Sequence, residues 1–223
     1  MLKKIIFILA LTNGNFTFSQ IEKGQKSIGI NIGDFQNRKE VSSLNSIKST
    51  NYSSSINFNY FVSDKFSIGM KYRLGIGNGH YTENLKYESI SKSFNSTYGF
   101  TSSYYKKLAE KFYFVLTGDL NYRYKADHYT NKNYSQPIDV SIEPTIIETT
   151  SYSNFSNAFG INFQPSFLYF ITPKFGLKAA FGNLNYSYGF VGPQGNSTVK
   201  NYNNEFELNF STSSLSFGMN YFF

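Results

Sequence analysis

Residues 66–76 read FSIGMKYRLGI and alternate strictly between two kinds of side chain. The even positions from Phe66 to Ile76 hold large apolar or aromatic residues, whereas the odd positions hold Ser, Gly, Lys and Arg. Successive side chains of a β-strand point to opposite faces of the sheet. This period of two therefore predicts a strand with one bulky face and one small or charged face.

The same alternation recurs along the chain, and no helical period of any length appears. Together with 66–76, the segments are 28–32, 52–62, 94–104, 112–124, 155–169, 175–190 and 206–223. This gives eight strands of about ten residues each, the length that a tilted membrane-spanning strand needs. The alternation slips by one residue near Gly182-Asn183 and near Ser213-Ser214, and each slip predicts a β-bulge.

The connections between these segments differ in length. Residues 63–65, 106–111 and 172–174 form short connections, whereas 36–50, 78–92, 128–152 and 191–205 are long, polar segments. Short turns at one end and long loops at the other are typical of outer-membrane barrels, whose long loops are extracellular.

Soluble and membrane barrels differ in whether the bulky side chains face inward or outward. A soluble barrel of the lipocalin or streptavidin type fills its interior with bulky residues, but an eight-stranded interior has little room. The 24 Phe and 19 Tyr of this chain would overfill it. The bulky face is therefore expected to face lipid, and we predict an all-β fold, an eight-stranded antiparallel transmembrane β-barrel of up-and-down meander topology.

The first residues have the order of a secretory signal peptide. Lys3 and Lys4 precede an apolar run from Ile5 to Leu11, and small residues follow at Thr17 and Ser19. We predict a signal peptide over 1–19, a barrel domain over 20–223 and a location in the cell outer membrane. Removal of two lysines changes the formal charge to (21 − 2) − 14 = +5. The lysines are scattered rather than clustered in one stripe, so nucleic acid is not an expected partner.

The last eight residues, SFGMNYFF, place Gly218, Tyr221 and Phe223 in a characteristic spacing. The segment resembles the C-terminal signal that the outer-membrane assembly machinery recognises in Gram-negative β-barrels. The mature chain as a whole resembles small outer-membrane barrels of the OmpA-transmembrane-domain and OmpX kind. This resemblance implies a structural or surface-interaction role, with outer-membrane lipids and the assembly machinery as partners.

Charged residues also occur on the inward face of the predicted strands. They are Lys71, Arg73, Asp119, Arg123, Lys178 and Glu207. Buried charges require partners, so we expect Lys71 and Arg73 to pair with Asp119, and Arg123 or Lys178 to pair with Glu207. Such a polar network would plug the lumen; the alternative is a narrow, cation-lined channel for small anionic solutes.

Enzymatic chemistry finds little support in the sequence. The absence of cysteine excludes thiolate sites, and no nucleotide-binding or metal-binding motif is present, so no cofactor and no metal are expected. The pattern at His80 and His128 is similar to that of outer-membrane lipid A deacylases, which use a His, a Ser two residues later and a Glu. Thr82 and Thr130 replace that Ser here, and Glu83 or Glu88 could orient His80. We expect no enzymatic activity, with a lipid A-modifying hydrolase as the alternative.

The long loops are the expected contact surface. The loop over 128–152 contains Ile138, Val140, Ile142, Ile146 and Ile147, which could extend the adjacent strands above the membrane. An edge of that kind can pair with a strand of an extracellular protein or peptide. The loop lysines are expected to attract lipopolysaccharide phosphates; they include Lys48, Lys86, Lys92, Lys132 and Lys200.

Overall fold

The computed structural model describes residues 21–42, 45–83, 86–134, 146–191, 201–210 and 215–223, which form ten β-strands. The strands are β1 (Lys26–Val41), β2 (Ser46–Ser63), β3 (Phe66–Glu83), β4 (Tyr87–Ala109), β5 (Phe112–Tyr134), β6 (Ile146–Thr172), β7 (Phe175–Ala180), β8 (Asn183–Val191), β9 (Asn201–Asn209) and β10 (Ser216–Phe222). This described part contains no helix with the length and apolarity that crossing a membrane requires.

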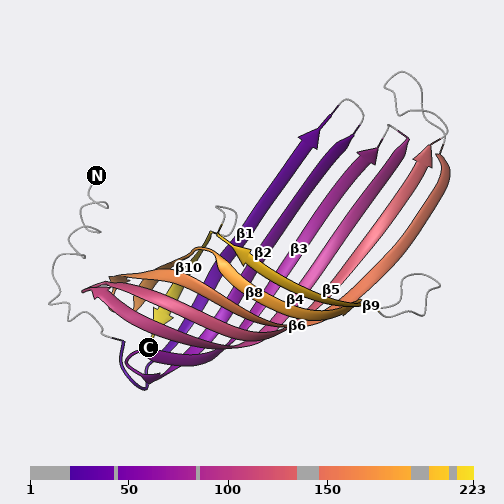
Figure 1. Ribbon diagram of the computed structural model, residues 1–223. Coiled ribbons are helices and arrows are strands. Elements are labelled where there is room, and N and C mark those ends of the chain that lie inside the picture. The colour runs from indigo at the N-terminus through magenta and orange to yellow at the C-terminus, as the bar shows by residue number, and fades with distance from the viewer. Residues whose placement is uncertain (1–20, 43–44, 84–85, 135–145, 192–200, 211–214) are drawn as a thin grey trace, which may run out of the picture.

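Eight of these strands close into a ring (Figure 1). β1 to β6 pair antiparallel in chain order, β6 pairs with β7, β7 with β10, and β10 with β1. Reciprocal backbone hydrogen bonds between Lys26 and Phe223, of 2.8 and 2.9 Å, end the closing ladder. The predicted eight-stranded antiparallel barrel is confirmed.

β8 continues β7 along the same side of β6 after a one-residue irregularity, and β9 pairs with β8. Residues 181–183 face only residues 164–165 of β6, so the pairing register shifts by one there. Gly182 has a φ of +67°, a conformation that favours glycine. The predicted bulge at Gly182-Asn183 is confirmed, whereas the one at Ser213-Ser214 lies outside the described residues.

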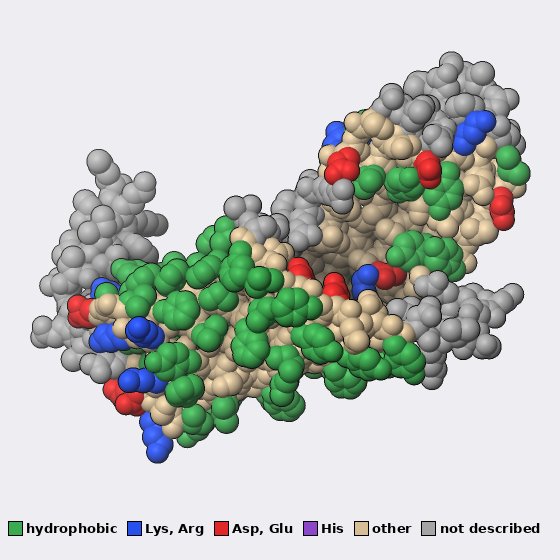
Figure 2. All heavy atoms as spheres, viewed as in Figure 1, with side chains coloured by type: hydrophobic (Ala, Val, Ile, Leu, Met, Phe, Trp, Pro, Cys, Tyr) green, Lys and Arg blue, Asp and Glu red, His purple; other side chains and the backbone are tan. Residues whose placement is uncertain are grey.

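The outward face of the ring carries the bulky side chains. Ile68, Phe100 and Phe217, for example, are 52%, 69% and 64% exposed. Figure 2 shows such side chains covering the wall of the barrel without a break by charged groups, which gather at its ends. We call this surface the apolar belt. Its exposed area far exceeds what a soluble protein leaves in water.

The inward face is apolar only at the end with the short turns. A layer of buried apolar side chains fills the barrel there, and we call it the apolar plug: Ile21, Phe61, Tyr105, Tyr113, Val115, Leu168, Phe170 and Phe222. The ring of Phe61 contacts those of Tyr105 and Phe222, with centroid separations of 5.0 and 6.1 Å. No local pattern in the sequence predicts this layer.

At the other end the strands continue far beyond the apolar belt. β4 and β5 have 23 residues each and β6 has 27, against the expected ten or so. We call the upper parts of β1 to β6 the extended sheet, which comprises 33–41, 46–50, 78–83, 87–92, 128–134 and 146–153. Figure 1 shows it rising from one side of the barrel.

The prediction of long loops was therefore wrong over most of 36–50, 78–92 and 128–152. Above the membrane both faces of a sheet can be polar, so the alternation that marks a strand is absent. Paired backbone groups and cross-strand rings support the sheet instead. Tyr129 and Tyr152, for example, stack with centroids 5.1 Å apart. In the fourth predicted loop, 191–205, β9 already begins at Asn201, and residues 192–200 lie outside the described ranges.

The apolar plug should contribute more to stability than the apolar belt does. Phe61→Ala is expected to lower the free energy of unfolding by about 3–5 kcal/mol, because it leaves a cavity among packed rings. Phe58→Ala on the same strand should cost clearly less, since lipid replaces the lost contacts. Urea titration of the barrel in lipid vesicles, followed by heat-modifiable gel migration, measures both. Equal losses would contradict this distinction.

Candidate functional site

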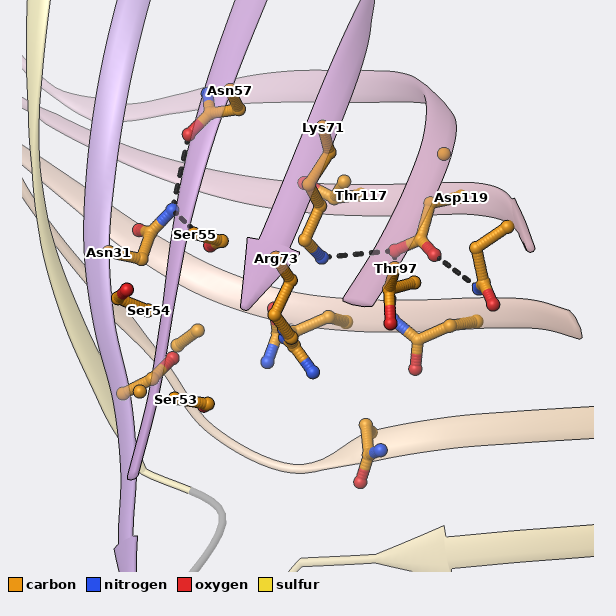
Figure 3. A pocket seen from close by; sticks show the side chains of 18 of the residues that line it. Asn31, Ser53, Ser54, Ser55, Asn57, Lys71, Arg73, Thr97, Thr117 and Asp119 are labelled. Atoms are coloured by element: carbon orange, nitrogen blue, oxygen red, sulfur yellow. Dashed lines mark hydrogen bonds and ion pairs between the residues drawn. The ribbon is translucent and has the colours of Figure 1, made fainter. Parts of the chain in front are cut away.

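The lumen contains a polar cavity of about 520 Å³ above the apolar plug. All six charged residues predicted to face inward line it, and Figure 3 shows Lys71 and Arg73 pointing into it from β3. The cavity lining holds five cations and two carboxylates, an excess of three positive charges (5 − 2). This chemistry suits a small anion.

Asp119 is the most completely bonded of the charged groups. Lys71 Nζ lies 3.3 Å from its Oδ2. Asn162 donates to the same oxygen at 3.1 Å, and Asn121 donates to Oδ1 at 2.7 Å. Since the Asp119 side chain is only 5% exposed, these donors replace the water that the carboxylate loses.

The other expected ion pairs are not found. Lys178 Nζ donates to Thr117 Oγ1 at 3.5 Å. Glu207 Oε1 accepts a hydrogen bond of 3.3 Å from Asn209. Within the described ranges, no ion pair joins Glu207 to Arg123 or Lys178, or Arg73 to Asp119. Two of the lining cations are thus neutralised, Lys71 by Asp119 and Lys125 by Asp127, the second with 2.8 Å between Nζ and Oδ2. The other lining cations, Arg73, Arg123 and Lys178, form no ion pair within the described ranges.

The three residues of the predicted assembly signal also have structural positions. Gly218 faces the lumen, where a Cβ would overlap Asn31 Oδ1. That amide donates to Asn57 Oδ1 at 3.1 Å, so glycine at 218 makes room for a cross-strand hydrogen bond. Tyr221 and Phe223 are exposed in the apolar belt and stack at 5.9 Å. Recognition of this segment by the assembly machinery stays a prediction.

The apolar belt ends abruptly on the outer face of β2 to β6. Its last row, read across the paired strands, is Tyr52, Ile76, Phe94, Ala126 and Phe155. The next outward row is Thr50, Asn78, Lys92, His128 and Ser153. The row above that contains Lys48 and His80. Apolar side chains therefore give way to polar ones within two residues along each strand, which marks the edge of the hydrocarbon region.

His80 belongs to a hydrogen-bonded cluster on this outer face. Its Nε2 lies 2.8 Å from Glu88 Oε1. Glu88 Oε2 accepts a hydrogen bond of 2.8 Å from Tyr134 and lies 3.3 Å from Lys132 Nζ. We call His80, Glu88, Lys132 and Tyr134 the rim cluster.

The rim cluster keeps Glu88 ionised. Partial burial acts to raise the pKa of its carboxyl, but hydrogen bonds from Tyr134, His80 and Lys132 outweigh burial and leave the pKa below its usual value. Burial and the hydrogen bond to Glu88 raise the pKa of Tyr134 to about 12. At neutral pH the carboxylate is therefore negative and the phenol is neutral.

The rim cluster lacks a completed nucleophile. Thr82 lies on the outward face with His80, two residues along β3, yet no hydrogen bond joins their side chains in the described structure. His128 Nδ1 bonds Ser153 Oγ at 3.0 Å instead of Thr130. The described residues also contain no group of three or more side chains suited to hold a metal ion.

The predicted contact loop lies only partly within the described residues. Ile146 and Ile147 begin β6 and are exposed. Ile138, Val140 and Ile142 lie outside the described residues, as does Lys200.

A closed ring with a polar interior and an apolar exterior defines the class of this protein. Lipid is the only surrounding that suits the apolar belt, and a ring leaves no strand edge unpaired inside it. The protein is an outer-membrane β-barrel. Its short turns face the periplasm and its extended sheet faces the outside.

Comparison with known proteins finds similar solved structures at low sequence identity. No family model and no curated protein matches the sequence. Among solved structures, the chain is similar to Ail, the attachment invasion locus protein of Yersinia pestis (14% identity, 90% of this chain and 99% of that chain, TM-score 0.39). It is also similar to OprG of Pseudomonas aeruginosa (10%, 92% and 99%, 0.38) and to the protease OmpT of Escherichia coli (8%, 95% and 96%, 0.39).

The apolar plug should prevent ion flow through the lumen. We expect the purified protein to give no steady channels in planar lipid bilayers, because the plug lies between the polar cavity and the periplasm. A Phe61→Ala/Phe222→Ala variant, which opens the plug, should conduct if it stays folded. Steady, ion-selective channels of defined size in the wild-type protein would contradict this expectation.

Proposed function

We propose that this protein acts in surface interaction rather than in transport or catalysis, and that its extended sheet binds an extracellular protein or peptide by strand addition. The free edge of β6 is the observation that carries the proposal. Over Ile146–Phe155, β6 pairs with β5 on one side, and β8 joins its other side only from Ser156 onward. Within the described ranges, the backbone groups of this edge have no neighbouring strand.

The composition of the β6 edge supports an interactive role. Exposed edges in natural proteins are usually protected by Lys, Pro or a covering segment. Residues 146–155 contain neither Lys nor Pro and one charged residue, Glu148, whereas the opposite free edge on β1 contains the two cations Arg38 and Lys39. An edge with unprotected N–H and C=O groups can form main-chain hydrogen bonds with an extended peptide, and Ile147 adds an exposed apolar contact.

Paired proline substitutions test this edge. The N–H groups of Thr149 and Thr150 point to opposite sides of β6 because successive residues of a strand alternate. One of the two substitutions, Thr149→Pro or Thr150→Pro, therefore removes a hydrogen bond to β5, and the other removes a donor at the free edge. The variant that keeps wild-type thermal stability identifies the edge donor, and we expect that variant to lose peptide binding.

The probe is a phage-displayed library of random peptides of about twelve residues, a length that covers the edge. Peptides are selected on the folded wild-type barrel in detergent micelles. Failure to enrich any peptide, or full binding by the stable proline variant, would refute the proposal.

The contact between His80 and Glu88 favours a second candidate, a lipid A hydrolase. A histidine oriented by a carboxylate and a threonine on the same face are parts of a nucleophilic site. Under the non-enzymatic function proposed above, cells that express the wild type and His80→Ala should show the same lipid A acylation pattern by mass spectrometry. Loss of an acyl chain that depends on both His80 and Thr82 would favour the hydrolase.

A further inference from the structure

The outer face of the extended sheet carries almost all of its cations. Lys39, Lys48, Lys92 and Lys132 point outward together with His80 and His128, as the strand registers show. The acids Glu40, Glu83, Asp127 and Glu148 lie at the alternate, inward positions. Among the residues of this sheet whose side chains the structure describes, Glu88 is the one outward acid, and the rim cluster already engages it with His80 and Lys132.

Lys39 and Lys48 lie directly opposite each other on β1 and β2, and both are exposed. Like charges at directly opposed positions of neighbouring strands destabilise a sheet. Within the described structure neither lysine forms an ion pair with an acidic side chain. An anion from outside the chain would remove this repulsion.

Lys92 and His128 form a second cationic position on β4 and β5, where they also face each other across the sheet. Two strand spacings and two residues of offset separate Lys92 from Lys48, roughly 12 Å between their Cα atoms. The outer face thus presents two cationic positions at about the separation of the two ends of a disaccharide. Both positions lie directly above the last apolar row.

An apolar groove of about 600 Å³ lies lower on the same face. It runs across the belt between outward side chains of β2 to β5, among them Ile56, Met70, Tyr98 and Leu120. Six residues along β4 separate Tyr98 from Lys92, a distance of roughly 20 Å. An acyl chain can cover that distance from a headgroup held at the lysines.

We propose that this outer face is a binding site for a glycolipid of the outer leaflet that carries two phosphates on a disaccharide, the chemistry of the lipid A part of lipopolysaccharide. One phosphate lies between Lys39 and Lys48, the other lies at Lys92 and His128, and an acyl chain enters the groove. The two cationic positions favour this occupant over a phospholipid, which offers a single phosphate. The site is distinct from the β6 edge and does not depend on strand addition.

The experiment compares lipid binding to the folded full chain in detergent micelles by native mass spectrometry. The probes are bisphosphorylated lipid A, monophosphorylated lipid A and phosphatidylglycerol. We expect the wild type to bind the bisphosphorylated form most tightly. Lys39→Gln/Lys48→Gln should weaken that binding roughly thirtyfold and remove the preference for two phosphates, because each of the two lysines near an anionic surface contributes about fivefold.

A matched control removes the same charge at the other end of the barrel. Lys106→Gln/Lys107→Gln changes two exposed lysines beside a short turn and should leave lipid A binding unchanged. The Lys39→Gln/Lys48→Gln barrel should fold at least as well as the wild type, since a repulsive pair is removed; heat-modifiable gel migration checks this. If that variant does not fold, Lys92→Gln is expected to weaken binding of the bisphosphorylated form by roughly fivefold.

Three results would overturn the proposal. The first is that the wild type binds phosphatidylglycerol as tightly as bisphosphorylated lipid A. The second is that it binds monophosphorylated and bisphosphorylated lipid A with equal affinity. The third is that the folded lysine variants bind bisphosphorylated lipid A as tightly as the wild type does.

Discussion

Closure of the hydrogen-bonded ring is the constraint on which the rest of this structure depends. In hydrocarbon every backbone N–H and C=O needs a partner within the protein. β10 supplies the partners for β1, and the ladder ends at Lys26 and Phe223. Once the ring is closed, alternation along each strand sends apolar side chains to lipid and small polar ones inward. Glycine at positions such as 218 then provides the space for the inward amides.

The ring closes completely only within the membrane, and the demand for closure ends with the hydrocarbon. Beyond Ile32, β1 is no longer paired with β10 in the described structure, and beyond the bulge at Gly182 the chain leaves β10 for β9. Water can hydrogen bond the free edges there. The same sequence therefore forms a closed barrel in lipid and an open sheet outside it, and each part has its own chemistry.

The sequence predicts the barrel but neither the full length of its strands nor the apolar plug. Alternation such as that of 66–76 is a direct consequence of having lipid on one side, so strands, faces and the bulge at Gly182 could be predicted. The extended sheet has water on both sides, and segments such as 87–92 carry no comparable period.

The plug was missed because Phe61 and Phe222 are simply apolar residues at inward positions near strand ends. Their grouping depends on strand registers that no local pattern reveals. The rim cluster was partly foreseen, since Glu88 was considered as a partner of His80, whereas Lys132 and Tyr134 reach Glu88 from β5.

The length of the central strands also fixes how far the protein reaches. The 23 residues of β5 span roughly 75 Å, and a barrel tilt of about 40° turns this into a rise of somewhat under 60 Å. The apolar belt ends on β5 at Ala126, eight residues before the end of the strand at Tyr134. At the same rise and tilt, the tip of the sheet therefore stands roughly 20 Å above the hydrocarbon. A large, folded partner can dock at that height without its own surface meeting the headgroups, which leaves the lower part of the sheet to the lipid beside it.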